Sequence, residues 1–171
     1  MPGVLTWEPV ADSTLTIAVS ALLRELLDGA DPVTAFVLNP GDLGVFRSLD
    51  KLSAADASTV PAAGGSSIAA HVDHLRYGFE LMNRWSHGEN PFSDANYAAS
   101  WKRLTVTESE WKQLRDQFRA EARAWQENIR LPRTLTNDEL NAIVGSVVHL
   151  AYHLGAMRQI HRATRGPAAR D

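Results

Sequence analysis

In four long segments of this 171-residue chain, apolar residues recur with the 3.6-residue period of an amphipathic helix. No series of segments has the pattern expected of β-strands. Capping residues, glycines and prolines mark the ends of these segments. The pattern predicts an all-α fold in which the apolar stripes face one another in a four-helix bundle. The expected helices cover about 12–28, 66–85, 107–128 and 137–164, and we treat 1–171 as a single domain.

The connections between these helices constrain their arrangement. Residues 31–67 are rich in Pro and Gly but too long for bare loop in a compact domain, so we expect two short helical turns there, near 42–49 and at Ser53-Ala-Ala-Asp56. A short link around Pro132 predicts that the third and fourth helices are antiparallel neighbours. About twenty residues separate the second and third helices, which permits a parallel pair.

Composition excludes several classes of function. The chain has no cysteine, so a disulfide scaffold, a thiolate zinc site and a cysteine nucleophile are impossible. The formal charge is -3 and the arginines are scattered, so the sequence predicts no basic patch that would bind nucleic acid or an anionic membrane. No stretch approaches about 18 uninterrupted apolar residues, and Met1–Pro9 lacks the pattern of a secretory signal. We therefore expect no membrane span and a cytoplasmic protein.

The histidines carry the chemistry of this sequence. His149 and His153 lie four residues apart on the predicted fourth helix, so both imidazoles can reach one ion from the same helix face. Neutral imidazole suits zinc, nickel, copper and iron. Two histidines hydrogen-bonded at a helix seam would show the same spacing, so the pair alone is a weak signal.

The predicted second helix supplies a third candidate ligand. Its apolar stripe consists of Ile68, Val72, Leu75, Phe79 and Met82. His71 lies about 60° from the centre of that stripe and His74 about 120° away. We therefore predict His71 as the ligand, with His74 either supporting a ligand from behind or lying on the surface. His87 and His161 receive no role.

The sequence lacks the motifs of two well-known classes of metal site. A zincin protease needs His-Glu-x-x-His, and the residue after His149 is Leu150. A carboxylate-bridged di-iron bundle needs Glu-x-x-His on paired helices, and that motif does not occur in the chain. The sequence therefore predicts neither of these two classes of metal site.

Two stretches of the sequence resemble signatures of the DinB/YfiT-like superfamily. Ser67-Ile-Ala-Ala-His71-Val-Asp-His-Leu75 is similar to its second-helix signature, and Val148-His-Leu-Ala-Tyr-His153-Leu-Gly-Ala-Met-Arg158-Gln to its fourth-helix signature. The resemblance implies an up-down-down-up bundle, often a homodimer, with His71, His149 and His153 on a divalent metal such as zinc or nickel. Many members have Gly-Gln where this chain has Gly155-Ala156, so a role for that glutamine is not expected here.

Three neutral histidines would leave a bound ion at least one open position, which is typical of a catalytic site. We therefore expect a metal-dependent enzyme of the thiol-dependent transferase or hydrolase type. Its small-molecule partner could be a low-molecular-weight thiol, since the chain has none of its own. The alternative is a non-catalytic bundle in which the metal or the histidines are structural or mediate an interaction. The sequence assigns no general base, because Asp73 lies away from the His71 side and Glu80 and Asp56 cannot be placed.

Overall fold

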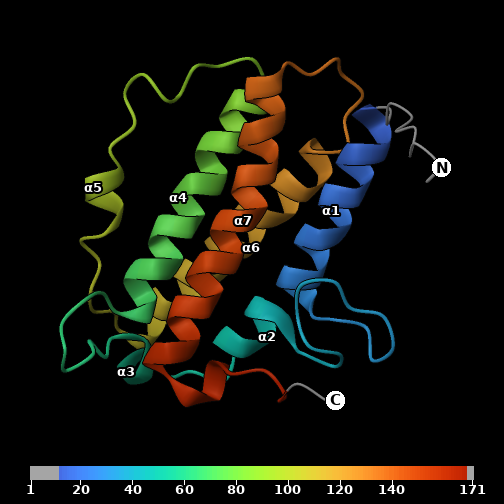
Figure 1. Ribbon diagram of the computed structural model, residues 1–171. Coiled ribbons are helices and arrows are strands. Elements are labelled where there is room, and N and C mark those ends of the chain that lie inside the picture. Colours follow the sequence, from blue (N-terminus) through green and yellow to red (C-terminus); the bar gives the residue numbers. More distant parts are fainter. Residues whose placement is uncertain (1–11, 169–171) are drawn as a thin grey trace.

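The computed structural model describes residues 12–168, which contain helices and irregular segments and no strand (Figure 1). The predicted all-α fold is therefore confirmed. The described helices are α1 Asp12–Asp28, α2 Gly44–Leu49, α3 Ala54–Ala57, α4 Ile68–Ser86, α5 Tyr97–Ser100, α6 Glu108–Asn128, α7 Asn137–Ile160 and the 3-10 helix η1 Arg162–Thr164. Met1–Pro9, where no secretory signal is expected, and both ends of the proposed domain 1–171 lie outside the described residues.

The four long helices α1, α4, α6 and α7 pack as a bundle, and α4 packs most extensively against α6. Phe79 of α4 stacks on Phe118 of α6 with ring centroids 6.1 Å apart. Farther along both helices, the rings of Trp85 and Trp125 are 6.2 Å apart. From the first contact to the second, the residue numbers rise on both helices. Helices α4 and α6 are therefore parallel, as their long connection permits.

Helix α7 runs in the opposite direction to α4 (Figure 1). His71 of α4 contacts His153 of α7, and about one turn farther along α4, His74 contacts His149, one turn earlier on α7. Residue numbers therefore rise on α4 as they fall on α7. This antiparallel contact places the two histidines of one helix opposite the two of the other.

Helix α1 completes the bundle against α6 and α7. At the middle of α1, the Ser20 hydroxyl donates to the carbonyl of Gln126, and at the end of α1 Asp28 pairs with Arg123. Because the α6 residue numbers fall as those of α1 rise, these helices are antiparallel. The up-down-down-up order that the family resemblance implies stays a prediction.

Capping boxes begin three of the helices where the sequence placed them. In Ser53–Asp56, Thr107–Glu110 and Thr136–Glu139, the first side chain accepts the backbone N–H of the last residue, whose carboxylate accepts the N–H of the first. Each such cap stabilises a helix by about 1 kcal/mol. The short turns predicted in the connection 31–67 are present as α2 and α3.

The predicted end of the fourth helix at 164 is wrong, because α7 ends at Ile160. His161 leaves the helical region with φ -134° and ψ 126°. Its Nδ1 accepts the backbone N–H of Ala163, and its Nε2 lies 3.3 Å from Asp56 Oδ1. These local partners stabilise an extended residue at 161, and the chain continues as η1.

Two tryptophans of α6 lie at the centre of the core. Trp111 and Trp125 are fully buried, and each indole N–H has a partner: the carbonyl of Leu52 at 2.9 Å and the hydroxyl of Ser146 at 2.8 Å. Burial of these large aromatic rings stabilises the fold. Because each N–H has a hydrogen-bond partner, no buried donor is left unsatisfied. The two tryptophans tie α6 to the connection after α2 and to α7.

An ion pair fixes the carboxyl-terminal part of α7, near the histidines. The Asp42 side chain is 1% exposed and accepts two hydrogen bonds from Arg158, at 2.7 and 2.8 Å. It also accepts the backbone N–H of Gly44 at the start of α2. Because Asp42 is buried, its charge requires these partners. The contact holds α7 against α2 about one turn beyond His153.

Among the described helices, α7 is long and apolar enough to cross a membrane by length and composition. A single such helix is weak evidence, because core helices of water-soluble bundles meet the same criterion. Here α7 packs against α1 and α4.

Candidate metal centre

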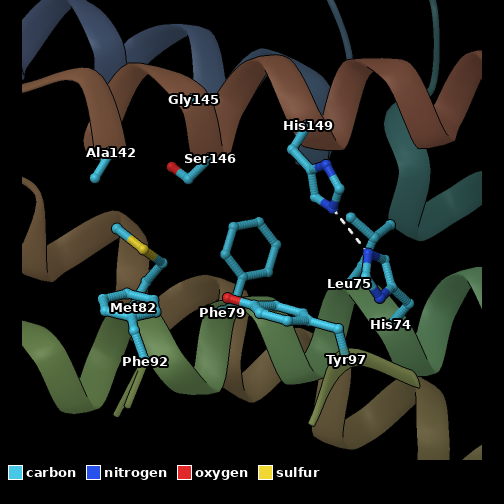
Figure 2. Close-up of a pocket in the computed structure, with 11 residues that line it drawn as sticks. His74, Leu75, Phe79, Met82, Phe92, Tyr97, Ala142, Gly145, Ser146 and His149 are labelled. Atoms are coloured by element: carbon cyan, nitrogen blue, oxygen red, sulfur yellow. Dashed lines mark hydrogen bonds between the residues drawn. The ribbon is translucent and has the colours of Figure 1, made fainter. Parts of the chain in front are cut away.

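Four histidines from α4 and α7 meet at the seam between these helices. Nδ1 of His71 lies 2.9 Å from Nδ1 of His153, and Nε2 of His74 lies 3.0 Å from Nε2 of His149. Figure 2 shows the second pair pointing toward each other across the seam. The two histidine pairs also contact each other, since the ring centroids of His149 and His153 are 4.3 Å apart. The sequence patterns of the two helices thus converge on one cluster.

Burial within the cluster is uneven. His71, His74 and His153 are buried, and His153 is only 2% exposed, whereas His149 lies at the exposed rim. Nε2 of His153 is buried and has no hydrogen-bond partner among the described residues. A buried polar atom without a partner costs about 1–3 kcal/mol. This nitrogen is therefore available to a ligand that enters the cluster.

Ser100 of α5 sets the protonation of His74. Its hydroxyl lies 2.7 Å from the carbonyl of Tyr97, to which it donates its one proton, and 2.9 Å from Nδ1 of His74. Toward His74 the hydroxyl must therefore accept, which places the imidazole proton on Nδ1. Nε2 of His74 then carries a lone pair directed at His149. This is the tautomer that a metal ligand needs.

His71 can act on His153 in the same way. Either nitrogen of the Nδ1–Nδ1 contact can be the donor. When His153 donates, its proton is on Nδ1 and its buried Nε2 carries a lone pair. His71 then holds the ring of His153 from behind, as an outer partner commonly holds a metal-binding histidine.

The tightest group of potential ligand atoms belongs to His74, His149 and His153. One nitrogen from each lies within 4.8 Å of the others. Two nitrogens on one tetrahedral zinc, each at 2.0–2.1 Å, lie about 3.3 Å apart. The 3.0 Å separation of His74 and His149 is already close to that value. Small rotations of the side chains would bring all three nitrogens onto one ion.

The surroundings keep these imidazoles neutral. Burial, followed by the neighbouring His149 and His71, lowers the pKa of His74 to about 4. Burial, followed by the neighbouring imidazoles, lowers the pKa of His153 to about 3. Burial also lowers the pKa of His71 and of His149. Neutral rings with free lone pairs are the form that binds a metal at pH 7.

The segment between α4 and α6 covers one side of the cluster. Trp101, directly after α5, stacks on His74 with ring centroids 4.3 Å apart and meets His71 edge-on at 5.1 Å. The sequence assigned no role to Tyr97 or Trp101. Ser100 was missed, because no spacing in the sequence connects it with a histidine 26 residues earlier.

The structure brings the predicted residues together, with one difference. His149 and His153 meet as expected, and His71 contacts His153, but His74 completes the tight group. The choice of His71 as a ligand therefore stays a prediction. The surface alternative for His74 is wrong, because this side chain is buried. Its ring turns toward α7 under Trp101, which the helix wheel of α4 alone could not show.

Other polar residues considered from the sequence serve elsewhere. The buried Asp73 carboxylate pairs with Arg76 and Arg103 at 2.9 Å each. Glu80 pairs with Arg76, and Asp56 belongs to the capping box of α3. None of these carboxylates is free to act as a base at the histidine cluster. Of the remaining histidines, His87 ends α4 on the surface and His161 precedes η1.

Together, a helical bundle and histidines that converge from two facing helices define an all-α protein with a candidate metal centre. The chain belongs to the DinB superfamily, whose family model matches residues 45–157. The match spans α4, α6 and most of α7, including all four clustered histidines. No curated protein and no solved structure matches the chain.

Proposed function

We propose that this protein binds one divalent transition metal ion through His74, His149 and His153, and that His71 positions His153. Two observations carry the proposal. The buried Nε2 of His153 has no hydrogen-bond partner among the described residues. One nitrogen each of His74, His149 and His153 lies within 4.8 Å of the others. Ser100 supports the proposal by leaving the lone pair of His74 on the atom that faces the cluster. The donor set of neutral nitrogens fits zinc or nickel.

The arrangement favours a metal-dependent enzyme over a structural site. An ion held by three neutral imidazoles keeps its full charge and an open position, where it can polarise a substrate group or bind a thiolate. His149 lies at the rim and also lines a cavity, so a small molecule can approach the cluster from that side. A thiol-dependent transferase or a hydrolase remains the proposed class, and a structural role for the metal is the alternative.

The proposed setting of this activity is a cytoplasmic homodimer. Helix α7 exposes a row of apolar side chains at helical spacing, Val144, Val148 and Tyr152, of which Tyr152 is 70% exposed. Exposed apolar rows of this kind are typical of surfaces that pack against another chain. The row lies on the same helix as His149 and His153.

Zinc titration tests the proposed function directly. Metal-stripped protein should bind one zinc ion per chain, measured by calorimetry and by competition with a chromophoric chelator. A His87→Ala variant is the control, because that histidine lies outside the cluster, and it should bind zinc like the unchanged protein. Protein that retains neither zinc nor nickel after careful loading would refute the metal centre.

The role of Ser100 can be measured separately. Ser100→Ala removes the acceptor for Nδ1–H of His74, so the ring can rotate and its Nε2 lone pair is no longer enforced. We expect zinc affinity to fall about tenfold, within the range for residues that support metal ligands. Ser93→Ala is the matched control, because Ser93 is in the same connection and, among the described residues, its hydroxyl donates to the nearby carbonyl of Asn90. Equal affinities of both variants would show that Ser100 does not orient the ligand.

A further inference from the structure

A cavity of about 310 Å³ lies between α4 and α7 next to the histidine cluster (Figure 2). Its lining residues are His74, Leu75, Gly78, Phe79, Met82, Phe92, Tyr97, Ala142, Gly145, Ser146 and His149. In Figure 2, His74 and His149 lie at one end, and Met82, Phe92 and Ala142 at the other. The cavity thus leads from the candidate metal centre along the seam between the helices.

The lining has a polar end and an apolar body. The described residues that line it include no Asp, Glu, Lys or Arg. The Ser146 hydroxyl is already engaged, since it donates to the carbonyl of Ile143 and accepts from Trp125. Burial raises the pKa of Tyr97, which keeps its hydroxyl neutral. A charged group in the body of the cavity would find no counter-charge, so only an apolar group fits there without a large desolvation cost.

Two glycines leave the room for such a group. Gly78 of α4 and Gly145 of α7 lie in the cavity wall, and a Cβ at either position would meet no atom within 4 Å. Neither has a positive φ, so the backbone does not require glycine. Glycine inside a helix costs about 1 kcal/mol relative to alanine. Larger side chains at these positions would project into the cavity.

We propose that the cavity binds the apolar part of a small ligand, a single aromatic ring or a short alkyl chain, whose donor group reaches the histidine end. An apolar cavity of about 150 Å³ admits benzene, so 310 Å³ accommodates a ring with a short linker. The placement of the donor group rests on the proposed metal function, whereas the apolar selectivity rests on the cavity itself. The inferred substrate class is an aryl or alkyl compound with one soft donor, such as a thiol.

The first experiment compares two thiols on zinc-loaded protein. 3-Phenylpropane-1-thiol and ethanethiol share the same donor group, and we expect the phenyl compound to bind at least tenfold more tightly in calorimetry. Gly145→Leu fills the cavity and should reduce this affinity ratio to nearly one. Gly155→Leu is the matched control on the same helix, since its Cβ also meets open space but does not line the cavity, and it should keep the ratio. Gly78→Leu fills the opposite wall and replaces the first variant if that one does not fold.

The second experiment does not depend on a metal. Metal-free protein with ¹³C-methyl methionine is titrated with propylbenzene, which has no donor group. The Met82 methyl signal should shift, because Met82 lines the cavity, while that of Met157, buried elsewhere in the core, should not. A Met82 shift in protein that binds no zinc would refute the metal centre and support the apolar cavity. Bound zinc with equal thiol affinities and an unchanged Met82 signal would overturn this inference and leave the metal centre intact.

Discussion

Replacing His153 by alanine should lower zinc affinity by roughly a hundredfold or more while leaving the helical circular dichroism intact. Structural zinc sites bind with about 10 kcal/mol or more. Shared among three ligands, this makes the loss of one cost about 3 kcal/mol, or about a hundredfold. The helices persist because the bundle depends on the apolar stripes and tryptophans rather than on this imidazole. Competition titration with a chromophoric chelator measures the change.

The same titration decides between the two histidines of α4. We expect His74→Ala to match His153→Ala, because both remove a converging nitrogen. His71→Ala should cost about tenfold, because it removes only the partner that holds His153. The ligand set predicted from the sequence requires the opposite order. A larger loss from His71→Ala than from His74→Ala would therefore restore His71 as the ligand.

The metal-free protein should lose stability as the pH falls from about 6.5 toward 4. The unfolded chain takes up protons on histidine at about pH 6.5, whereas folded His74 and His153 stay neutral down to about 4 and 3. Since the unfolded state binds more protons in this window, the free energy of unfolding falls with the pH. The two residues together should cost on the order of a few kcal/mol. Above pH 6.5 neither residue contributes.

Urea unfolding in the presence of a chelator at pH 7, 6 and 5 measures this effect. His153→Leu removes a histidine whose pKa is lowered to about 3, so the stability of this variant should depend less steeply on pH. His87→Leu is the control, because that side chain is exposed at the end of α4, and it should keep the full dependence. A free energy of unfolding that stays constant from pH 7 to 5 would contradict the buried, neutral state of these histidines. Excess zinc at pH 7 should raise it by about 2.7 kcal/mol at a hundred times the dissociation constant.

Local interactions explain why the helices could be predicted from the sequence. The capping boxes at Thr107 and Thr136 and the 3.6-residue period involve residues only a few positions apart, and the structure has both helix starts there. The resemblance to the DinB superfamily is likewise confirmed by the family match. The end of α7 was missed because His161 is extended, and part of what holds it is a contact with the distant Asp56.

In the candidate site, too, local spacing could be predicted from the sequence, whereas contacts between helices could not. The sequence by itself determined that His149 and His153 share a helix face, because residues four apart in a helix must do so. Only the tertiary structure decided how His71 and His74 meet them. His71 and His74 lie about one turn apart on α4, and their roles depend on how α4 packs against α7. The role of His74 also depends on Ser100, which lies 26 residues later in the chain. Helical period fixes directions within one helix, whereas contacts between helices depend on side chains from the whole bundle.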